Sequence, residues 1–452
     1  MKSLSIYLKM IPLVFLLIFY TDLQFTAAQT DDLEIKQGLS DEELMELVQK
    51  QTFRYFWEGA GPKSGLARER YWIDEVYPHE DKPVVTSGGS GFGLMAIIVG
   101  IEREFITREE GLDRFEQIIS FLEEADRFNG VWPHWWYDET GETRPFSPRD
   151  DGADIVETSF VAQGLITVME YLRGGTEREQ QLVDRIQTLW EEINWNWHTK
   201  DGEENVLYWH WSPNHDWAMN HEIRGYNESL ITYVMAAAST TYPISEEVYH
   251  EGWARGSEMS QSTTHEGLTL TMRHNRGGKY GGPMFWAHYS YLGLDPRNLE
   301  DEYAHYWEHN VNHTLLNRLY CIENPEGYEG YGEHSWGLTS SYSVSGYSAH
   351  SADNDRGVIT PTAALSSFPY TPEYSMQAMR YFYEELGDRL WGKFGFYDAF
   401  SETEDWFPKR YLAIDQGPIV IMIENHRTGL LWDLFMQNED VQNGLDRLGF
   451  SY

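Results

Sequence analysis

Acidic residues gather at the start of an apolar segment in the stretch RDDGADIVETS, residues 149–159, which leads into FVAQGLITVMEYL. Asp150, Asp154 and Glu157 are spaced by four and three positions, which would place them on one face of a helix. A helix that begins near Gly152 or Asp154 instead puts Asp154 and Glu157 in its first turn and leaves Asp150 in the entering loop. First-turn acids are commonly caps that contribute about 0.3–1 kcal/mol each, and one or two would suffice. The excess of acids, despite the repulsion between like charges, leaves a chemical role as open as capping.

Two further apolar segments begin with an acid in the same way. Glu228 lies in RGYNESLITYVMAAAS and Asp415 in AIDQGPIVIMIENHR, each expected in the first turn of a helix. Three such helix starts directed into one cleft would surround a substrate with carboxylates. Glycoside hydrolysis needs such a set, because one protonated acid serves the leaving oxygen and a second carboxylate activates water or attacks the sugar. Helix N-termini keep acids ionised, as a base requires, whereas aromatic neighbours raise the pKa of a carboxyl group, as an acid requires.

Aromatic residues are concentrated in polar, proline-containing loops rather than in helical stripes. The loop WPHWWYDETGETRPFSP and the loop YWHWSPNHDWAMNHEIRG both precede apolar segments. Sugar rings stack on exposed aromatic faces, and neighbouring polar side chains bind their hydroxyls. The substrate-binding residues predicted from these loops are His134, Trp135, Trp136, Arg144, Trp211, Trp217 and Tyr226.

Apolar and amphipathic helical segments alternate along most of the chain. Six pairs are predicted, at residues 91–103 with 108–127, 154–172 with 176–195, 227–240 with 245–255, 283–292 with 301–320, 360–367 with 372–390, and 415–425 with 428–448. Six antiparallel pairs predict an all-α (α/α)6 toroid, with a helical solenoid as the alternative. The long aromatic loops precede the first helix of each pair, so in a toroid they would build one cleft at one end.

The composition restricts the class of protein further. The chain has 452 residues, 15% aromatic residues and a formal net charge of −38, so it should fold around a large core and repel nucleic acid and anionic membranes. Residues 1–28 read as a signal peptide, which with the lone Cys321 indicates a bacterial periplasmic or secreted protein. The remainder divides into 29–50, a leader with the start of the first helix, and 51–452, one catalytic domain. The charge leaves neutral or cationic ligands open, and we expect a monomer.

Two competing motifs are weaker. The stretch GFGLMA at residues 91–96 matches a dinucleotide fingerprint, but no alternation of strands and helices follows, so its glycines are expected to allow close helix packing. His210, His215, His221 and Glu222 lack the spacing of a zinc motif, and a loop histidine beside tryptophan is more often a hydroxyl binder. We therefore predict neither a metal site nor a cofactor.

Several long motifs resemble the bacterial glucoamylase-like domain, which includes the endo-β-1,2-glucanases of glycoside hydrolase family 144. They are VVTSGGSGFGLMAI, GVWPHWWYDETGE, DDGADIVETSFVAQGL, RGYNESLITYVMAAAS and AIDQGPIVIMIENHRTGLLW, in order from about residue 51 to 435. The resemblance implies an (α/α)6 toroid that cleaves β-1,2-glucan with inversion and releases sophoro-oligosaccharides. It also implies candidate catalytic acids at Asp150, Asp154, Glu157 and Glu228, in agreement with the residues singled out above.

These observations lead to one assignment with stated alternatives. Glu228 is predicted as the general acid, and one of Asp150, Asp154 or Asp415 as the base, acting on water directly or through a relay. Glu157 would orient or tune that base. The alternatives are an exo-acting enzyme that releases sophorose, an α-glucan glucoamylase, and a glycan-binding protein without activity.

Overall fold

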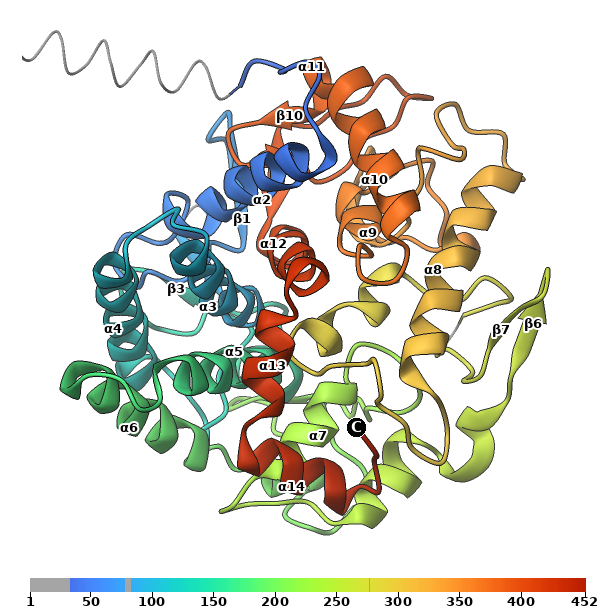
Figure 1. Ribbon diagram of the computed structural model, residues 1–452. Coiled ribbons are helices and arrows are strands. Elements are labelled where there is room, and N and C mark those ends of the chain that lie inside the picture. The colour runs from blue at the N-terminus through green and yellow to red at the C-terminus, as the bar shows by residue number, and fades with distance from the viewer. Residues whose placement is uncertain (1–32, 78–82, 276) are drawn as a thin grey trace, which may run out of the picture.

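The computed structural model describes residues 33–77, 83–275 and 277–452, and within them the helices form two layers around a common centre (Figure 1). The expected signal peptide, residues 1–28, lies outside these residues. The α-helices are α2 (Asp41–Trp57), α3 (Ser87–Glu102), α4 (Arg108–Glu124), α5 (Ile155–Leu172), α6 (Glu177–Glu191), α7 (Leu230–Ala238), α8 (Tyr306–Glu323), α9 (Pro361–Leu365), α10 (Pro372–Arg380), α11 (Gly387–Leu390), α12 (Ala413–Arg427), α13 (Leu430–Met436) and α14 (Glu439–Arg447). Across the described ranges, none of the helices combines the length and the apolar character that crossing a membrane requires.

The inner layer consists of apolar helices and the outer layer of amphipathic ones. In α3 every residue but the last is buried, and α5, α7 and α12 are buried along most of their lengths. The outer helices α2, α4 and α6 each begin with a capping box. The hydroxyl of the cap residue accepts from the backbone N–H of the third helical residue, and the Glu side chain of that residue accepts from the backbone N–H of the cap. The predicted pairing of apolar with amphipathic helices in an (α/α)6 toroid is confirmed.

Glycines let the inner helices α3 and α5 approach closely. A Cβ at Gly91 would lie 2.0 Å from the carbonyl oxygen of Phe160, and one at Gly164 would lie 2.3 Å from the carbonyl oxygen of Gly91. Strand β2 (Val84–Thr86) precedes α3 but pairs antiparallel with β3 (Trp135–Tyr137), so the parallel sheet of a dinucleotide fold is not formed here. The glycines of GFGLMA therefore serve helix packing, as predicted.

Several predicted helices are shorter or differently wound than expected. The fourth inner segment is a pair of 3-10 helices, η5 (Met284–Ala287) and η6 (Tyr289–Leu292), because Pro283 and Gly293 bound a stretch too short for more than two turns. The third outer segment is a π-helix, η3 (Val248–Trp253), followed by the 3-10 helix η4 (Gly256–Ser260). The fifth outer helix likewise breaks after α10 into a π-helical turn, η8 (Tyr381–Glu385). The remaining 3-10 helices are η2 (Asn196–Thr199) and η7 (Ala352–Asn354).

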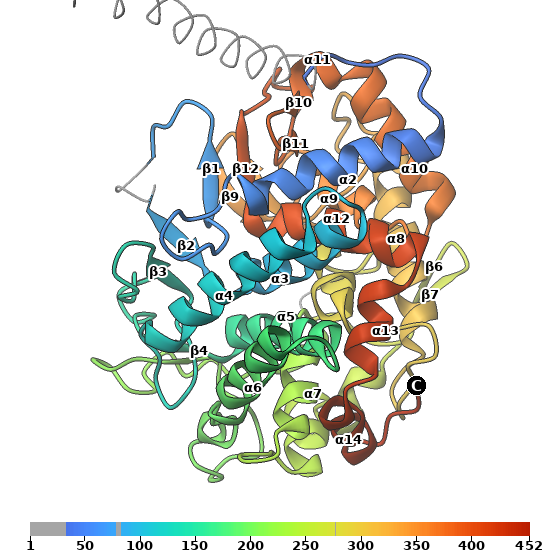
Figure 2. The same cartoon turned by 60° about the vertical axis from the view of Figure 1, so that its left-hand side comes forward.

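Short strands occur in the loops between helices. In the described part of the chain they form six two-stranded antiparallel pairs, β1–β12, β2–β3, β4–β5, β6–β7, β8–β9 and β10–β11. Beyond β2 and β3, they are β1 (Arg70–Trp72), β4 (Ala153–Asp154), β5 (His210–Trp211), β6 (Thr263–His265), β7 (Leu268–Leu270), β8 (Ser340–Ser343), β9 (Gly346–Ala349), β10 (Trp391–Gly392), β11 (Gly395–Phe396) and β12 (Arg410–Leu412). Figure 2 shows β1, β2, β3, β4, β9 and β12 together on one side of the helical body. Strand β1 pairs with β12, so an early and a late segment of the chain meet there.

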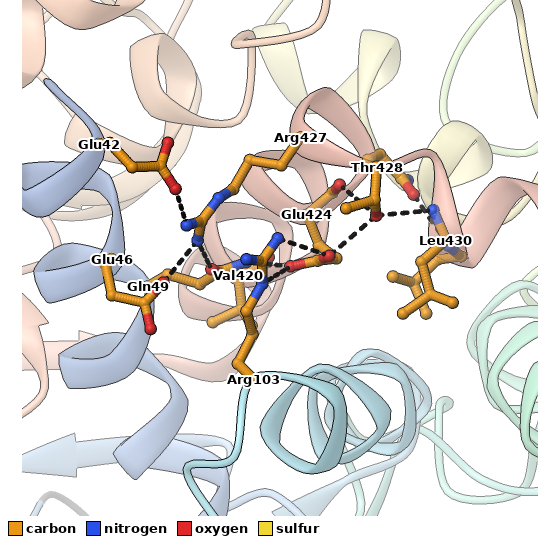
Figure 3. A network of polar contacts seen from close by, with 11 residues as sticks. Glu42, Glu46, Gln49, Arg103, Val420, Glu424, Arg427, Thr428 and Leu430 are labelled. Carbon is orange, nitrogen blue, oxygen red and sulfur yellow. Dashed lines mark hydrogen bonds and ion pairs between the residues drawn. The ribbon is translucent and has the colours of Figure 1, made fainter.

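A polar network joins α2, α3 and α12 near the C-terminal ends of the inner helices α3 and α12 (Figure 3). The Glu424 side chain is only 2% exposed and accepts from Arg103 through both carboxylate oxygens, at 2.7 and 2.9 Å. Gln49 and Thr428 also donate to this carboxylate, at 3.1 and 2.8 Å. Because each oxygen is hydrogen-bonded, the buried charge is compensated.

Replacing Glu424 by Gln is expected to lower the free energy of unfolding by roughly 2–3 kcal/mol, because Arg103 loses its anionic partner. The matched control is Glu46→Gln. Glu46 pairs with Arg427 in the same network, but the Glu46 side chain is 38% exposed. That control should cost about 0–1 kcal/mol. Urea denaturation of the two variants measures the difference, and equal losses would contradict this account of the network.

Candidate active site

A cavity of about 580 Å³ opens where the N-termini of the inner helices meet the paired strands. Its size is in the range of small-molecule binding sites. Thr86, Glu157, Glu228 and Leu412 line it, and they lie at or just before the starts of α3, α5, α7 and α12. Aromatic side chains form most of the remaining wall, namely Trp72, Trp135, Phe146, Phe160, Trp209, Phe285, Tyr289, Tyr342 and Tyr347. The cleft predicted at one end of the toroid is therefore present.

The cavity wall contains both acidic and basic side chains. Three of them are acids, Glu69, Glu157 and Glu228, and three are basic, Arg70, Arg410 and His134. His134 counts as a cation because its pKa is raised to about 9, against the opposing effect of burial, by the charges of Glu157, Asp154 and Asp150 and the hydrogen bond with Asp154. A nearly neutral aromatic cavity inside a protein of net charge −38 fits an uncharged ligand.

Asp154 is the cap of α5 and lies behind the cavity wall. Its Oδ1 accepts from the backbone N–H groups of Val156 and Glu157 at 3.1 and 3.0 Å, and its Oδ2 lies 2.9 Å from Nδ1 of His134. Burial alone would raise the pKa of Asp154, but the hydrogen bond and charge of His134 lower it. With no exposed surface, Asp154 is an ionised anchor that orients His134 and cannot itself touch a substrate.

Glu157 faces the cavity and is held from two sides. Its Oε2 accepts from the backbone N–H of Gly88, in the first turn of α3, at 2.9 Å, and its Oε1 lies 3.8 Å from Nε2 of His134. Burial raises the pKa of Glu157 to about 7, while His134 and the Gly88 N–H act in the opposite direction. The ionised form of Glu157 thus has a donor and a counter-ion in place.

Gly88 is expected to be required for this placement. A Cβ there would lie 2.3 Å from Oε2 of Glu157 and 2.9 Å from the Phe160 ring, so Gly88→Ala must displace the carboxylate. We expect kcat to fall on the order of a hundredfold, because small displacements of a reacting group are costly. Gly332→Ala is the matched control, since a Cβ at Gly332 meets no atom within 4 Å. Steady-state kinetics of both variants test this, and an unimpaired Gly88→Ala would contradict it.

Glu228 lies in the turn before α7 rather than in the helix, where it had been predicted. The Asn227 side chain accepts from the Ser229 N–H at 2.9 Å, and the Ser290 hydroxyl donates to the Glu228 carbonyl at 2.6 Å, which together fix this turn outside the helix. Burial raises the pKa of Glu228 to about 7, and the charges of Glu157 and Asp154 add to the effect. Hydrogen bonding favours the charged form of Glu228, whereas the neighbouring cation His134 favours the charged form of Glu157.

Asp150 and Asp415 are buried close to the cavity but do not line it. Burial and the charge of Asp154 raise the pKa of Asp150 to about 7, and its Oδ2 lies 3.3 Å from Nε2 of His210. Burial and the neighbouring Asp398 raise the pKa of Asp415 well above its usual value. Asp150, Asp154 and Asp415 therefore lie outside the cavity wall, and the assignment of the base to one of them stays a prediction.

Two of the predicted sugar-binding residues line the cavity, and a third supports them. His134 and Trp135 are in the wall, and the Arg144 guanidinium lies 5.0 Å from the centre of the Trp135 ring. Phe146 packs against both His134 and Trp135, with ring centres 4.3 and 4.8 Å apart. The loop WPHWWYDETGETRPFSP thus supplies one wall, as predicted.

The other four predicted sugar-binding residues lie outside the cavity. Trp136 is fully buried, because neighbouring residues of β3 point to opposite faces and Trp135 takes the cavity face. Trp211 and Trp217 pack on Trp197, at 4.9 and 5.3 Å between ring centres, after the chain has turned back between Ser212 and Asp216. Tyr226 is core, with its hydroxyl 2.9 Å from the Asn310 side chain. The structure thus places these four residues outside the cavity wall, and their contact with substrate stays a prediction.

A second wall was missed because it is assembled from segments distant in sequence. Trp72 of β1 pairs with Arg410 of β12, whose guanidinium lies 3.8 Å from the centre of the Trp72 ring. The Trp72 indole N–H donates to the Tyr342 hydroxyl at 3.3 Å, which joins the β8–β9 hairpin to this wall. Neither Trp72 nor Arg410 lies in a motif, so nothing local in the sequence marks them.

One group of side chains in the described residues has metal-ligand chemistry. Single ligand atoms of His134, Asp150 and Asp154 all lie within 4.8 Å of one another. However, Nδ1 of His134 is already in hydrogen-bond contact with Asp154, and Nε2 faces Glu157. The arrangement is that of a hydrogen-bonded imidazolium between carboxylates.

Known proteins resemble this chain over most of its length. The family model described as "Putative glucoamylase" matches residues 220–439. An endo-β-1,2-glucanase from Chitinophaga pinensis, solved with sophorotriose and glucose, is 58% identical, with 92% of this chain and 99% of that chain covered and a TM-score of 0.90. An exo β-1,2-glucooligosaccharide sophorohydrolase from Parabacteroides distasonis is 45% identical over 91% of this chain, which spans only 58% of that protein's length.

A more distant solved structure shares the fold alone. An endo-β-1,2-glucanase from Talaromyces funiculosus, solved with β-1,2-glucan, is 10% identical with a TM-score of 0.64, and each chain is covered to 91%. By contrast, this chain matches nearly the whole Chitinophaga enzyme at 58% identity, which is enough to show a common family. The chain belongs to the bacterial glucoamylase-like family of glycoside hydrolases that includes the endo-β-1,2-glucanases of family 144.

Proposed function

We propose that this glycoside hydrolase cleaves β-1,2-glucan within the chain, inverts the anomeric carbon and releases sophoro-oligosaccharides. The observation that carries the proposal is that Glu157 and Glu228 face one aromatic cavity with different support for their charged forms. A pair of carboxyl groups in which one keeps its proton and the other loses it is what an acid and base mechanism requires.

Glu228 is the general acid in this mechanism. Burial holds it protonated up to about pH 7, and protonation of the leaving oxygen consumes that proton. Ionised Glu157, with Gly88 and His134 in support, receives the proton of the attacking water. Asp154 orients His134, so Asp150 and Asp154 act through this pair rather than on the water itself.

Endo action is favoured over exo action by the extent of the resemblance. The chain covers 99% of the Chitinophaga endo-β-1,2-glucanase at 58% identity, but 58% of the Parabacteroides sophorohydrolase at 45% identity. We also infer that the chain is exported to the periplasm or secreted, on the strength of the basic and apolar pattern of residues 1–28.

The deciding experiment is the time course of products from purified mature protein with linear β-1,2-glucan, with soluble starch in parallel. A ladder of sophoro-oligosaccharides from the glucan at early times is the expected result. Sophorose alone would replace the endo assignment by the exo one. Activity on starch but not on the glucan would overturn the proposed substrate, and optical rotation or proton NMR of the first product reports the anomer.

A further inference from the structure

Two aromatic side chains of the cavity wall are also exposed to solvent. In the described part of the chain, the aromatic residues with more than a third of their surface exposed are Tyr137, Phe146, Tyr242, Tyr347 and Tyr452. Of these, Phe146 and Tyr347 line the cavity, and they are 48% and 54% exposed. The other residues of the wall, apart from Gly346, are buried or partly buried. Phe146 and Tyr347 therefore mark the edge at which the cavity opens to solvent.

Phe146 forms one part of this edge, and its ring is held in place from behind. The Phe146 backbone N–H donates to the Asp150 carbonyl at 2.8 Å, which closes a tight turn after the ring. The ring stacks on His134, with ring centres 4.3 Å apart and an angle of 27° between the planes, and it meets Trp135 at 4.8 Å. Protein thus supports the ring on one side, while nearly half of the residue stays open to solvent.

Tyr347 forms another part of the edge, on the β8–β9 hairpin. It stands directly opposite Tyr342 in the antiparallel register, so the two side chains lie on one face of the hairpin. The two rings meet edge to face, with centres 6.3 Å apart. Tyr342 is itself anchored, because its backbone N–H donates to the buried Asp398 carboxylate at 2.8 Å. Tyr347 therefore rests on a fixed neighbour and presents the rest of its side chain to solvent.

The size of the cavity explains why its edge matters. A volume of about 580 Å³ is that of a small-molecule site, so a polymer cannot be enclosed in it. Endo cleavage leaves glucan on both sides of the bond that is cut, and a long chain must therefore cross the edge on each side. Phe146 and Tyr347 come from segments far apart in the sequence, one after β3 and one in β9. Exposed apolar side chains at the margin of a binding site are typical of ligand contacts.

We propose that Phe146 and Tyr347 bind glucosyl units of β-1,2-glucan that lie outside the cavity, and thereby favour long chains over short oligosaccharides. This rests on the proposed function, since it concerns the same polymer in the same site. A sugar ring has apolar C–H faces, and packing one of them on an aromatic ring removes apolar surface of both partners from water. A chain that reaches both residues gains both contacts, whereas an oligosaccharide contained within the cavity gains neither.

Tyr347→Ala and Phe146→Leu test the proposal. Alanine removes the Tyr347 ring, and leucine removes the flat face of Phe146 but keeps an apolar contact with His134. We expect each variant to raise KM for long β-1,2-glucan by about fivefold to tenfold with kcat little changed. On the shortest sophoro-oligosaccharide that the enzyme cleaves, kcat/KM should stay within about twofold of wild type, because that substrate does not reach the edge. In the double variant the two effects on KM should multiply.

The matched controls are Val344→Ala for the hairpin and Tyr137→Leu for the segment around β3. Val344 is 57% exposed between β8 and β9, and Tyr137 is 38% exposed at the end of β3. Both lie outside the cavity wall. Each control removes a similar amount of exposed apolar surface from the same segment as its partner variant. Both should keep the wild-type KM for the polymer.

A second readout needs no turnover. Calorimetric titration of Glu228→Gln with long β-1,2-glucan, with and without Tyr347→Ala, should show the same loss of about fivefold to tenfold in affinity. Unchanged KM and affinity in the variants, with wild type active on the glucan, would overturn this proposal alone. Equal losses on the polymer and on the short oligosaccharide would also overturn it, since they indicate damage to the cavity. Wild-type protein that neither cleaves nor binds the glucan would overturn the proposed function and this proposal together.

Discussion

Glu228→Gln should lose about 10²–10⁴-fold in kcat on β-1,2-glucan while it still binds sophoro-oligosaccharides. Glutamine keeps the shape of the side chain and its contacts with the cavity, but it has no proton to give to the leaving oxygen. The pKa of Glu228, raised to about 7 by burial, is the feature that makes this proton available near neutral pH. Steady-state kinetics and calorimetric titration with a sophoro-oligosaccharide separate the two effects.

The control for Glu228→Gln is Glu204→Gln, at an exposed position outside the cavity. It should retain wild-type kcat and KM, which shows that loss of one acid from a strongly acidic protein has no general effect. Turnover by Glu228→Gln within a few-fold of wild type would remove Glu228 from the mechanism, and loss of binding together with kcat would indicate a structural role.

Glu157→Gln is expected to have the second largest effect, a loss of about 10²–10³-fold in kcat. The glutamine amide cannot accept a proton from water at neutral pH, and its nitrogen would face His134 or the Gly88 N–H, both of which are donors. The variant thus lacks the carboxylate, and the donors that held it do not match the amide nitrogen. The rate of product release from the glucan at saturating substrate measures the loss.

Glu69→Gln is the matched comparison for Glu157→Gln. Glu69 also lines the cavity, so its replacement removes one acid from the same cavity, but Glu69 pairs with Arg70 beside it. We expect less than about a tenfold change in kcat for Glu69→Gln, since its role is confined to the wall. A larger loss for Glu69→Gln than for Glu157→Gln would reassign the base to Glu69.

The fold was predictable because its signals are local and repeated. Capping boxes such as Ser40 with Glu43 and the alternation of apolar and amphipathic segments each act over a few residues, and they recur along the chain. The helices that failed to form as predicted, η5 and η3, lie where prolines, glycines and tertiary packing override a short local pattern. Over one or two turns, sequence periodicity does not distinguish an α-helix from a 3-10 helix or a π-helix.

The candidate site was predictable in part, for the same reason. Glu157 and His134 are marked by dense local motifs, and they do meet in the cavity. Whether an acid lies in the cavity wall, as Glu157 does, or behind it, as Asp154 does, is set by tertiary contacts that no motif records. Trp72 and Arg410 depend on a pairing between segments about as far apart as the chain allows. Only the three-dimensional structure reveals that wall.

The pairing of β1 with β12 also bears on when the enzyme becomes active. Arg70, Tyr71 and Trp72 meet Leu412, Tyr411 and Arg410, and helix α2 packs on α12 beside them. Chains are synthesised from the N-terminus, and contacts of such long sequence separation form slowly. The cavity wall that contains Trp72 therefore forms only after residues near the C-terminus have been synthesised. A nascent or truncated chain that ends before residue 410 would hold Glu157 and Glu228 without the wall opposite them. The segments that carry Glu157 and Glu228 are thus synthesised well before the cavity that surrounds them can be completed.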